Sequence, residues 1–272
     1  MSTVKETVSE PVTAAVSEMA AEEKNLASLS FDGYDFGSID PSLEAMLKHG
    51  VHFGHLKSRL HPSMRPLVYL TRKNVNIINL EKTRDYLERS EKFLAETAKS
   101  GKPILFVGIK KHTQEFIKSL AIRLGESYVT DRWLGGTITN FAVIRERARY
   151  LRETEEKLER GEFGMYTKLE RLKKMEEIER LERRMGGIKN MRELPGAIVI
   201  ADGKEAELVI REAHAIGIPV VAIMDTNANA ASVEYPIPGN DDALSSLRFL
   251  LGCLGKSVLD AKEAAVAAKQ SK

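Results

Sequence analysis

Short apolar runs alternate with longer amphipathic stretches along most of the chain. The runs are apolar at successive positions, which is typical of strands covered on both faces of a sheet. They occupy residues 103–108, the region near 128–129, and residues 197–201, 219–224 and 235–237. Helices are predicted between and after them, over residues 112–124 and 205–216 and from about residue 240 onward. This alternation predicts an α/β fold with a doubly wound, mostly parallel sheet.

Similar elements are predicted upstream of these runs. Asp40-Pro41-Ser42 places an acidic cap candidate before a first-turn proline, which predicts a short helix to about Lys48. Residues 75–80 predict a strand and residues 81–99 an amphipathic helix. Residues 57–73 lie between the short helix and this strand. They contain prolines and have no helical period, so we expect a loop there.

A different pattern separates the two halves of the alternation. Residues 151–185 carry 10 basic and 10 acidic side chains among strong helix formers, with two stripes of leucine and isoleucine. Gly161 and Gly164 lie between the stripes and would cost a single long helix about 1 kcal/mol each. We therefore predict an inserted antiparallel coiled-coil hairpin over residues 144–186.

Composition sets the class of protein and the limits of the folded part. The chain has 272 residues, 43% of them hydrophobic, and one cysteine, Cys253, within an apolar run. The cysteine is expected to be a buried hydrophobic residue, and a reducing cytosolic location is expected. No apolar run reaches the length of a membrane span, and no signal peptide is recognised. We expect an acidic, disordered extension over residues 1–38, a folded domain over 39–262 and a frayed tail over 263–272.

Charge is distributed unevenly along the chain. Residues 1–40 carry 2 basic and 8 acidic side chains, whereas residues 48–150 carry 20 basic and 9 acidic ones, a net charge of +11. A segment this positive indicates a polyanionic partner. The cations predicted to bind phosphates lie on the expected loop: Lys57, Arg59, Arg65, Arg72 and Lys73.

Four further residues are candidates for RNA contacts. Lys110 and Lys111 follow the apolar run that ends at Gly108, where they could face phosphates. Arg132 and Trp133, the only tryptophan, could stack on a base or ribose. The alternative for Trp133 is that it anchors its loop in the core.

Catalytic motifs are missing from the expected places. No glycine-rich G-x-G-x-x-G fingerprint is present, and Gly255-Lys256-Ser257 lacks the earlier glycine of a phosphate-binding loop. No serine lies in a G-x-S-x-G elbow, and Cys253 has no evident histidine partner. The sequence therefore argues against an enzyme and against a small-molecule substrate.

A divalent-metal site is a weaker alternative. His49, His52 and His55 are spaced three apart, and Asp202 and Asp225 follow two predicted strands at the edge where doubly wound sheets place ligands. The other possibility is that these aspartates cap helices or accept hydrogen bonds from loop backbone.

Several motifs, in order over residues 40–260, resemble one family. They are GVHFGH at 50–55, NIINLEKT at 76–83, RWLGG at 132–136 with Thr139-Asn140, GGIK at 186–189, GIPV at 217–220, DTN at 225–227 and IPGNDDA at 237–243. Together they closely resemble the bacterial small-subunit ribosomal protein S2 family.

The resemblance implies a flavodoxin-like domain with an inserted hairpin, placed between the head and body of the small subunit. It implies binding to 16S ribosomal RNA, contacts with neighbouring small-subunit proteins and a role in docking ribosomal protein S1. A metal reported for some members would map onto His52, Asp202 and Asp225. The acidic extension is longer than the short N-terminus of the family.

We therefore expect a cytoplasmic, ribosome-associated structural protein that binds RNA by electrostatic attraction and has no membrane partner and no required cofactor. The rival hypotheses are a nucleotide-dependent α/β enzyme and a free adaptor that binds proteins through its hairpin.

Overall fold

The computed structural model describes residue 31 and residues 34–270. Its centre is a five-stranded parallel sheet in the order β5-β4-β6-β7-β8. The strands are β4 (Ile104–Val107), β5 (Ser127–Val129), β6 (Ala197–Ile200), β7 (Val220–Met224) and β8 (Tyr235–Pro238). All five coincide with the apolar runs, so the predicted α/β class is confirmed.

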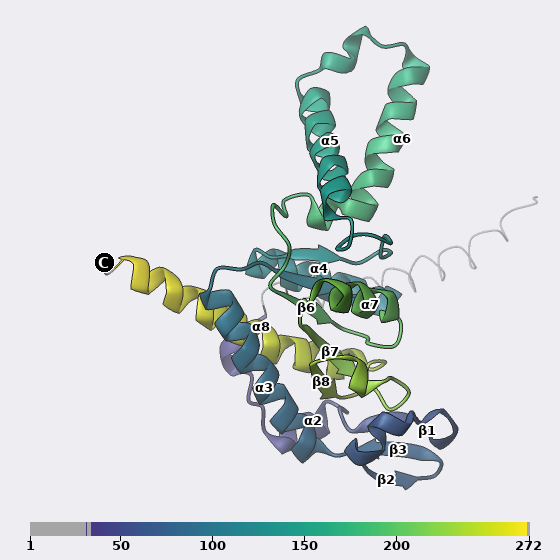
Figure 1. The fold of residues 1–272 in the computed structure, drawn as a ribbon, viewed down its shortest axis with the longest axis vertical. Coiled ribbons are helices and arrows are strands. Elements are labelled where there is room, and N and C mark those ends of the chain that lie inside the picture. Colours follow the sequence, from purple (N-terminus) through teal and green to yellow (C-terminus); the bar gives the residue numbers. More distant parts are fainter. Residues whose placement is uncertain (1–30, 32–33, 271–272) are drawn as a thin grey trace, which may run out of the picture.

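Helices cover both faces of this sheet (Figure 1). Ile104 and Phe106 of β4 belong to a core shared with α3, α4 and α8, whereas Leu105 and Val107 belong to a second core shared with α7 and the start of α5. Burial on both faces explains why these strands are apolar at successive positions. The helices are α3 (Leu80–Lys99), α4 (Lys111–Leu124), α5 (Phe141–Glu159), α7 (Glu207–Ile216) and α8 (Leu244–Gln270).

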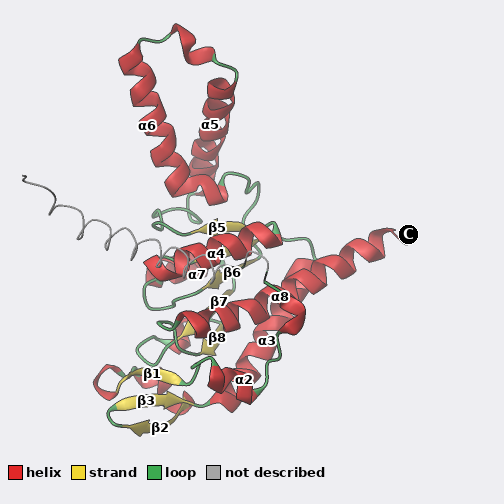
Figure 2. Cartoon of the chain, turned by 180° about the vertical axis from the view of Figure 1, so that it is seen from behind, coloured by secondary structure: helices red, strands yellow, loops and turns green. Residues whose placement is uncertain are grey.

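A separate antiparallel sheet of three strands lies at one end of the molecule, in the order β1-β3-β2 (Figure 2). Its strands are β1 (Phe53–Leu56), β2 (Val68–Arg72) and β3 (Val75–Ile78). The strand predicted at 75–80 is present as β3, but it pairs in this small sheet and is not part of the parallel one.

The prediction of a loop over residues 57–73 is wrong, because this stretch contributes to the small sheet. This stretch forms η2 (Lys57–Arg59), η3 (Pro62–Leu67) and strand β2. β2 is exposed at four of its five positions, so it has no apolar alternation from which a strand could be predicted. Lys73 and Asn74 join β2 to β3 with φ angles of +48° and +62°, as a type I′ hairpin turn requires.

Two helices, α5 and α6 (Lys168–Met185), project from the end opposite the small sheet and are joined through η4 (Glu162–Met165) (Figure 1). Gly161 ends the first helix with a φ of +73°, and Thr167 and Glu170 form a capping box at the start of the second. Lys174 on α6 donates to the Tyr150 hydroxyl on α5 at 3.0 Å. The single-helix alternative is therefore excluded, and the pair begins at Phe141, before the expected residue 144.

The base of this helix pair is held close to β5. A Cβ atom added to Gly187, in the turn η5 (Gly186–Ile188), would lie 2.2 Å from the carbonyl oxygen of Tyr128. Only glycine allows this approach, which accounts for one glycine of the GGIK motif.

The N-terminal boundary of the folded part differs from the expected one. Residues 1–30 of the predicted acidic extension lie outside the described residues. Phe31 and Phe36, however, are buried in the core shared with α4 and α8, and their rings stack with centroids 5.9 Å apart. The folded part therefore begins by Phe31, before residue 39.

Two glycines of α8 allow the N-terminal segment to pack closely against this helix. A Cβ atom on Gly252 would lie 2.9 Å from Ile39, and one on Gly255 would lie 3.1 Å from Phe36. The helix then continues to Gln270, through most of the residues expected to form a frayed tail. Cys253 of this helix is buried as expected, and burial raises the pKa of its thiol to about 12.

The remaining short elements are η1 (Phe36–Ser38), α2 (Leu43–Lys48) and η6 (Ala230–Ser232). α2 confirms the helix predicted to end at Lys48, but its cap is Ser42, whose hydroxyl accepts from the Ala45 amide at 3.2 Å, and not Asp40. Among the described helices none has the length and apolar character needed to cross a membrane.

The new N-terminal boundary can be tested with Phe36→Ala. Removing a buried ring leaves a cavity, so we expect the free energy of unfolding to fall by about 3 kcal/mol in urea titrations. Leu47→Ala is the control, because Leu47 is 57% exposed and its loss should cost less than about 0.5 kcal/mol. Equal effects of the two substitutions would show that the folded part begins after Phe36.

Candidate nucleic-acid interface and buried acidic cluster

The small sheet and its turns carry the basic side chains predicted to bind phosphates. Residues 45–80 contain six lysines and arginines and no aspartate or glutamate. No ion pair within the described residues neutralises the five predicted cations, and all five are exposed: Lys57, Arg59, Arg65, Arg72 and Lys73. Their side chains are therefore available to an external polyanion.

Backbone hydrogen bonds attach the small sheet to the loop after β7. The amide of His55 donates to Thr226 Oγ1 at 2.9 Å, and the amide of His61 donates to the Thr226 carbonyl oxygen at 2.8 Å. A Cβ atom on Gly54 would lie 2.6 Å from Thr226 Cγ2. The glycine between Phe53 and His55 is thus needed for β1 to approach this loop.

Three buried aspartates meet at the carboxyl ends of parallel strands. Asp202 follows β6, Asp225 follows β7 and Asp241 lies after β8. Asn240 turns the chain after β8, with its side-chain oxygen accepting from the amides of Asp242 and Ala243 at 2.9 and 3.1 Å. Parallel strands end at the same edge of a sheet, so these carboxylates collect there.

Lys110 neutralises part of this cluster. It comes from the loop between β4 and α4, and its Nζ lies 2.7 Å from Asp202, 3.3 Å from Asp241 and 3.1 Å from Asp242. Burial alone would lower the pKa of Lys110, but the pairs with aspartates outweigh burial and raise it. Lys110 is therefore paired with aspartates of the protein itself, and its predicted contact with RNA stays a prediction.

Within this cluster, ionisation of the Asp241 carboxyl is opposed by burial and by its acidic neighbours. Burial raises the pKa of its carboxyl, and the negative charges of Asp202 and Asp225 raise it further. Its Oδ1 is buried and has no hydrogen-bond partner among the described residues. Both effects favour the neutral form of the Asp241 carboxyl, because Lys110 alone does not balance the negative charges around it.

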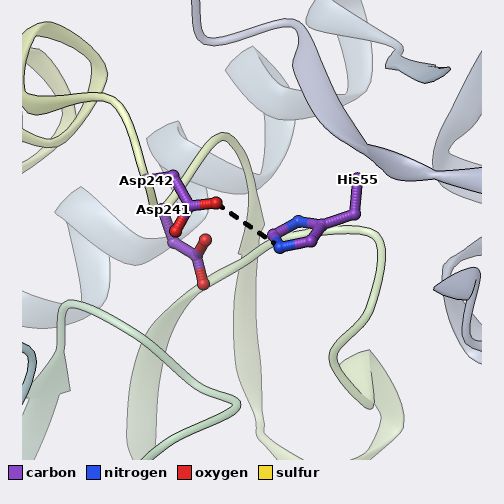
Figure 3. Close-up of side chains that lie close together, drawn as sticks. All are labelled: His55, Asp241 and Asp242. Atoms are coloured by element: carbon purple, nitrogen blue, oxygen red, sulfur yellow. Dashed lines mark ion pairs between the residues drawn. The ribbon is translucent and has the colours of Figure 1, made fainter.

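His55 supplies the second basic group. Its Nδ1 lies 2.9 Å from Asp225 Oδ2. Its Nε2 lies 3.4 Å from Asp242 Oδ2 (Figure 3). The hydrogen bond to Asp225 raises the pKa of His55, against the opposing effect of burial. His55 therefore links β1 of the small sheet to the acidic edge of the parallel sheet.

The geometry changes the predicted set of metal ligands. Ligand atoms of His55, Asp241 and Asp242 all lie within 4.8 Å of one another. Imidazole nitrogen and carboxylate oxygen are donors that divalent metals accept, and the unpartnered Asp241 oxygen fits that use. These three residues are the candidates to hold a metal, and in the present arrangement Lys110 lies 3.3 and 3.1 Å from Asp241 and Asp242. Asp202 and Asp225 pair with Lys110 and His55.

His52 takes a different position from the one expected. Its ring packs against Phe53 with centroids 4.0 Å apart, and burial lowers the pKa of the imidazole. Asp202 also accepts from the backbone amides of Lys204 and Glu205, at 3.0 and 3.3 Å, as the loop-capping alternative predicted. The sequence signal for this second set of candidate ligands was the Asp241-Asp242 pair, which follows a strand at the same edge.

Trp133 is buried at 5% exposure, so it cannot stack on a base where it lies. Its Nε1 donates to Glu212 Oε1 at 3.1 Å, and Glu212 also accepts from the amides of Gly136, Ile138 and Thr139 at 2.8, 3.2 and 3.4 Å. The core-anchoring alternative describes the position of Trp133. Lys111 and Arg132 are exposed, but they lie outside the small sheet.

Glu212 is a structural residue that sequence reasoning missed. Burial favours the neutral acid, but the hydrogen bonds from Gly136, Trp133, Ile138 and Thr139 outweigh it and lower the pKa of Glu212. The available signal was its place on the buried stripe of α7, beside Val209, Ile210 and Ala213. A carboxylate on an apolar stripe indicates a partner across the core.

Comparisons with known proteins find similar sequences along most of the chain. The family model described as Ribosomal protein S2 matches residues 46–261. The small ribosomal subunit protein uS2 of Roseiflexus sp. (strain RS-1) is 45% identical over 219 residues, covering 80% of this chain and 84% of that protein. The protein of the same name from Chloroflexus aurantiacus (strain ATCC 29366 / DSM 635 / J-10-fl) is 42% identical over 219 residues, covering 80% and 92%.

The ion pairs of His55 predict a pH-dependent contribution to stability. Because its pKa is raised in the folded state, the contribution is complete below the unfolded value near 6.5 and is lost as pH rises through the folded value. We expect His55→Gln to lower the free energy of unfolding by about 1–2 kcal/mol more at pH 5.5 than at pH 9. Urea titrations at both pH values measure this difference.

His52→Gln is the matched control, since burial lowers the pKa of His52 and its folded state resists protonation. The stability of this variant relative to the unsubstituted protein should therefore improve towards low pH. The same trend in both variants would contradict the assignment of His55 as the charged group of the cluster.

The Glu212 hydrogen bonds can be tested with Glu212→Gln. An amide oxygen replaces only part of the acceptor capacity, so we expect the free energy of unfolding at pH 7 to fall by about 2 kcal/mol. Fluorescence of the single tryptophan reports on the loop directly. Glu207→Gln on the same helix is the control, because its pair with Arg211 is exposed and should contribute less than about 0.5 kcal/mol.

Proposed function

Since this chain belongs to the ribosomal protein S2 family, we propose that it binds 16S ribosomal RNA through the basic surface of its small sheet. The observation that carries the proposal is the absence of acidic residues over residues 45–80, where six cations lie. Lysine and arginine side chains that replace the counterions of phosphates release those ions, and the release favours binding.

Family membership gives the setting of this function. The chain is a structural, non-enzymatic component of the small ribosomal subunit, a ribonucleoprotein that acts in translation. It is a ribosomal protein and is associated with ribosomes in the cytoplasm. Its contacts therefore position RNA and protein and do not carry out a reaction.

The finer fold assignment is flavodoxin-like. Counted along the chain from β4, the parallel strands have the order 2-1-3-4-5, which is the order of flavodoxin-like sheets and supports this assignment. Such sheets receive ligands at the carboxyl ends of their strands. Here the protein's own Lys110 and aspartates meet at that edge, which agrees with a structural role.

The helix pair α5–α6 is proposed as a second contact region. It projects from the end of the molecule opposite the small sheet, and its balanced charges differ from the basic surface there (Figure 1). From the family resemblance, we place the protein between head and body of the subunit, beside neighbouring proteins, where it helps dock ribosomal protein S1. Residues 39–262 are proposed as the ribosomal domain, together with Phe31 and Phe36, which pack into its core.

The RNA-binding proposal predicts a strong effect of charge reversal on the small sheet. The triple variant Arg59→Glu, Arg65→Glu and Arg72→Glu should lower affinity for purified small-subunit RNA more than about tenfold. The slope of log K against log salt should fall by roughly 2–3, because about three phosphate contacts are lost. Filter binding at several salt concentrations measures both quantities.

A triple reversal on the helix pair gives a control with the same change in net charge. Arg160→Glu, Arg180→Glu and Arg183→Glu replace exposed residues far from the small sheet. Equal losses from both triple variants would contradict binding through the small sheet. Saturable nucleotide binding without salt-dependent RNA binding would favour the rival enzyme, and absence from the sedimented small subunit would favour the free adaptor.

A further inference from the structure

We propose that the cavity between α7 and the loop after β7 holds the base of one unpaired RNA nucleotide, with Asn227 and His61 bonding to the edge of that base. This inference rests on the proposed RNA binding of the chain, and it adds a site for a single nucleotide beside the basic surface. It assigns a role to polar groups that have no partner among the described residues.

Three segments far apart in the sequence form the walls of this cavity, which has a volume of about 310 Å³. Arg211 and His214 of α7 form one wall, and the loop that contains Asn227 forms the second. The third is His61, which is held against that loop because its amide donates to the Thr226 carbonyl oxygen at 2.8 Å. A cavity of this volume is at the small end of the range for ligand sites and suits one nucleotide.

Asn227 has an amide group that the described residues do not use. Its Oδ1 is buried and accepts no hydrogen bond, although its backbone carbonyl accepts from Lys204 Nζ at 3.4 Å. An unpaired buried acceptor costs free energy, and this one therefore favours a donor on a ligand. The χ2 torsion of asparagine has broad minima, so the amide can turn its oxygen towards the cavity that it lines.

His61 provides a hydrogen-bond donor beside this amide. The Ser63 amide donates to His61 Nδ1 at 3.3 Å, so Nδ1 is an acceptor and the neutral ring carries its hydrogen on Nε2. No described residue bonds to Nε2, which leaves this N–H for a ligand acceptor. Every nucleobase has a donor and an acceptor side by side on its Watson–Crick edge, as a donor on His61 and an acceptor on Asn227 require.

α7 offers flat groups for the plane of a base. Arg211 and His214 are three residues apart on one face of the helix, and guanidinium and imidazole planes both stack on bases. Arg211 lies 3.3 Å from Glu207, and His214 lies 3.2 Å from Glu234. Because carboxylates offset both basic groups, this wall suits an uncharged base better than a phosphate.

The neighbouring cations indicate that the base belongs to RNA. Arg59 and Arg65 lie two residues before and four residues after His61, and both are exposed, as is Lys204 at the rim of the cavity. Phosphates on either side of the bound base would therefore meet positive charge. The bases of a duplex are stacked inside and cannot enter a cavity, whereas an unpaired nucleotide can turn its base outward.

The test compares Asn227→Ala and Arg211→Lys in the full chain, with a fluorescent single-stranded 12-nucleotide RNA and an RNA duplex of equal length. Asn227→Ala should weaken single-strand binding about 3- to 10-fold, the value of one hydrogen bond. Arg211→Lys should weaken it at least about fivefold, because lysine keeps the charge but loses the stacking plane. Both should change duplex binding less than about twofold and leave the salt dependence unchanged, since no phosphate contact is removed.

Two measurements show that these losses come from the cavity. The thermal midpoint of Asn227→Ala should stay within about 2 °C of the unsubstituted protein, because the side chain makes no hydrogen bond to a described residue. Arg149→Lys is the matched control for Arg211→Lys, because Arg149 is an exposed helical arginine with the same i,i+4 glutamate pair. It should bind both RNAs as the unsubstituted protein does.

Salt-dependent RNA binding that Asn227→Ala and Arg211→Lys leave unchanged, or weaken equally for both RNAs, would overturn this inference while the proposed function stands. Adenosine monophosphate should bind at least about tenfold more weakly than the 12-nucleotide RNA, because it lacks the contacts of the basic surface. Tighter binding of the monophosphate would assign the cavity to a free nucleotide and overturn the inference. Failure of the unsubstituted protein to bind either RNA would instead reject the proposed function, and the inference with it.

Discussion

Buried carboxylates at one edge of the parallel sheet need positive charge beside them, and much of the arrangement of this protein follows from that requirement. Asp202, Asp225 and Asp241 come from successive strands, so the topology itself brings them together. Lys110 reaches them from within the parallel domain, whereas His55 reaches them from the small sheet. The ion pair between His55 and the buried aspartates thus helps to position the small sheet against the parallel sheet.

The consequence is a separation of charge by function. Negative side chains at the sheet edge are neutralised inside the protein, and Lys110 is used for that purpose. The cations of the small sheet have no such internal partners among the described residues and remain directed outward. A further buried carboxylate, Glu212, holds the Trp133 loop by accepting hydrogen bonds from donors that are distant in sequence. The exposed cations therefore form the basic surface, whereas a different set of charged residues, which is buried, stabilises the core.

The parallel strands were predictable because burial on both faces leaves continuous apolar runs, as in β4 and β6. β2 was not, since a strand exposed at most positions has the composition of a loop. β3 was predicted as a strand, but its pairing in the small sheet was not, because local periodicity does not specify the pairing partner. For the site, the exposed cations followed from composition. His55 in place of His52, and Glu212 as the partner of Trp133, depend on contacts across 170 and 79 residues, which no local pattern encodes.

The burial of Phe31 and Phe36 against α8 joins the first described residues of the chain to the last helix. During synthesis these rings emerge early, and their packing surface on α8 emerges more than 200 residues later. Contacts of such long sequence separation form late in folding, because the intervening chain must be ordered first. The main core is therefore completed only after α8 has been synthesised, and the nascent chain carries an exposed aromatic segment until then.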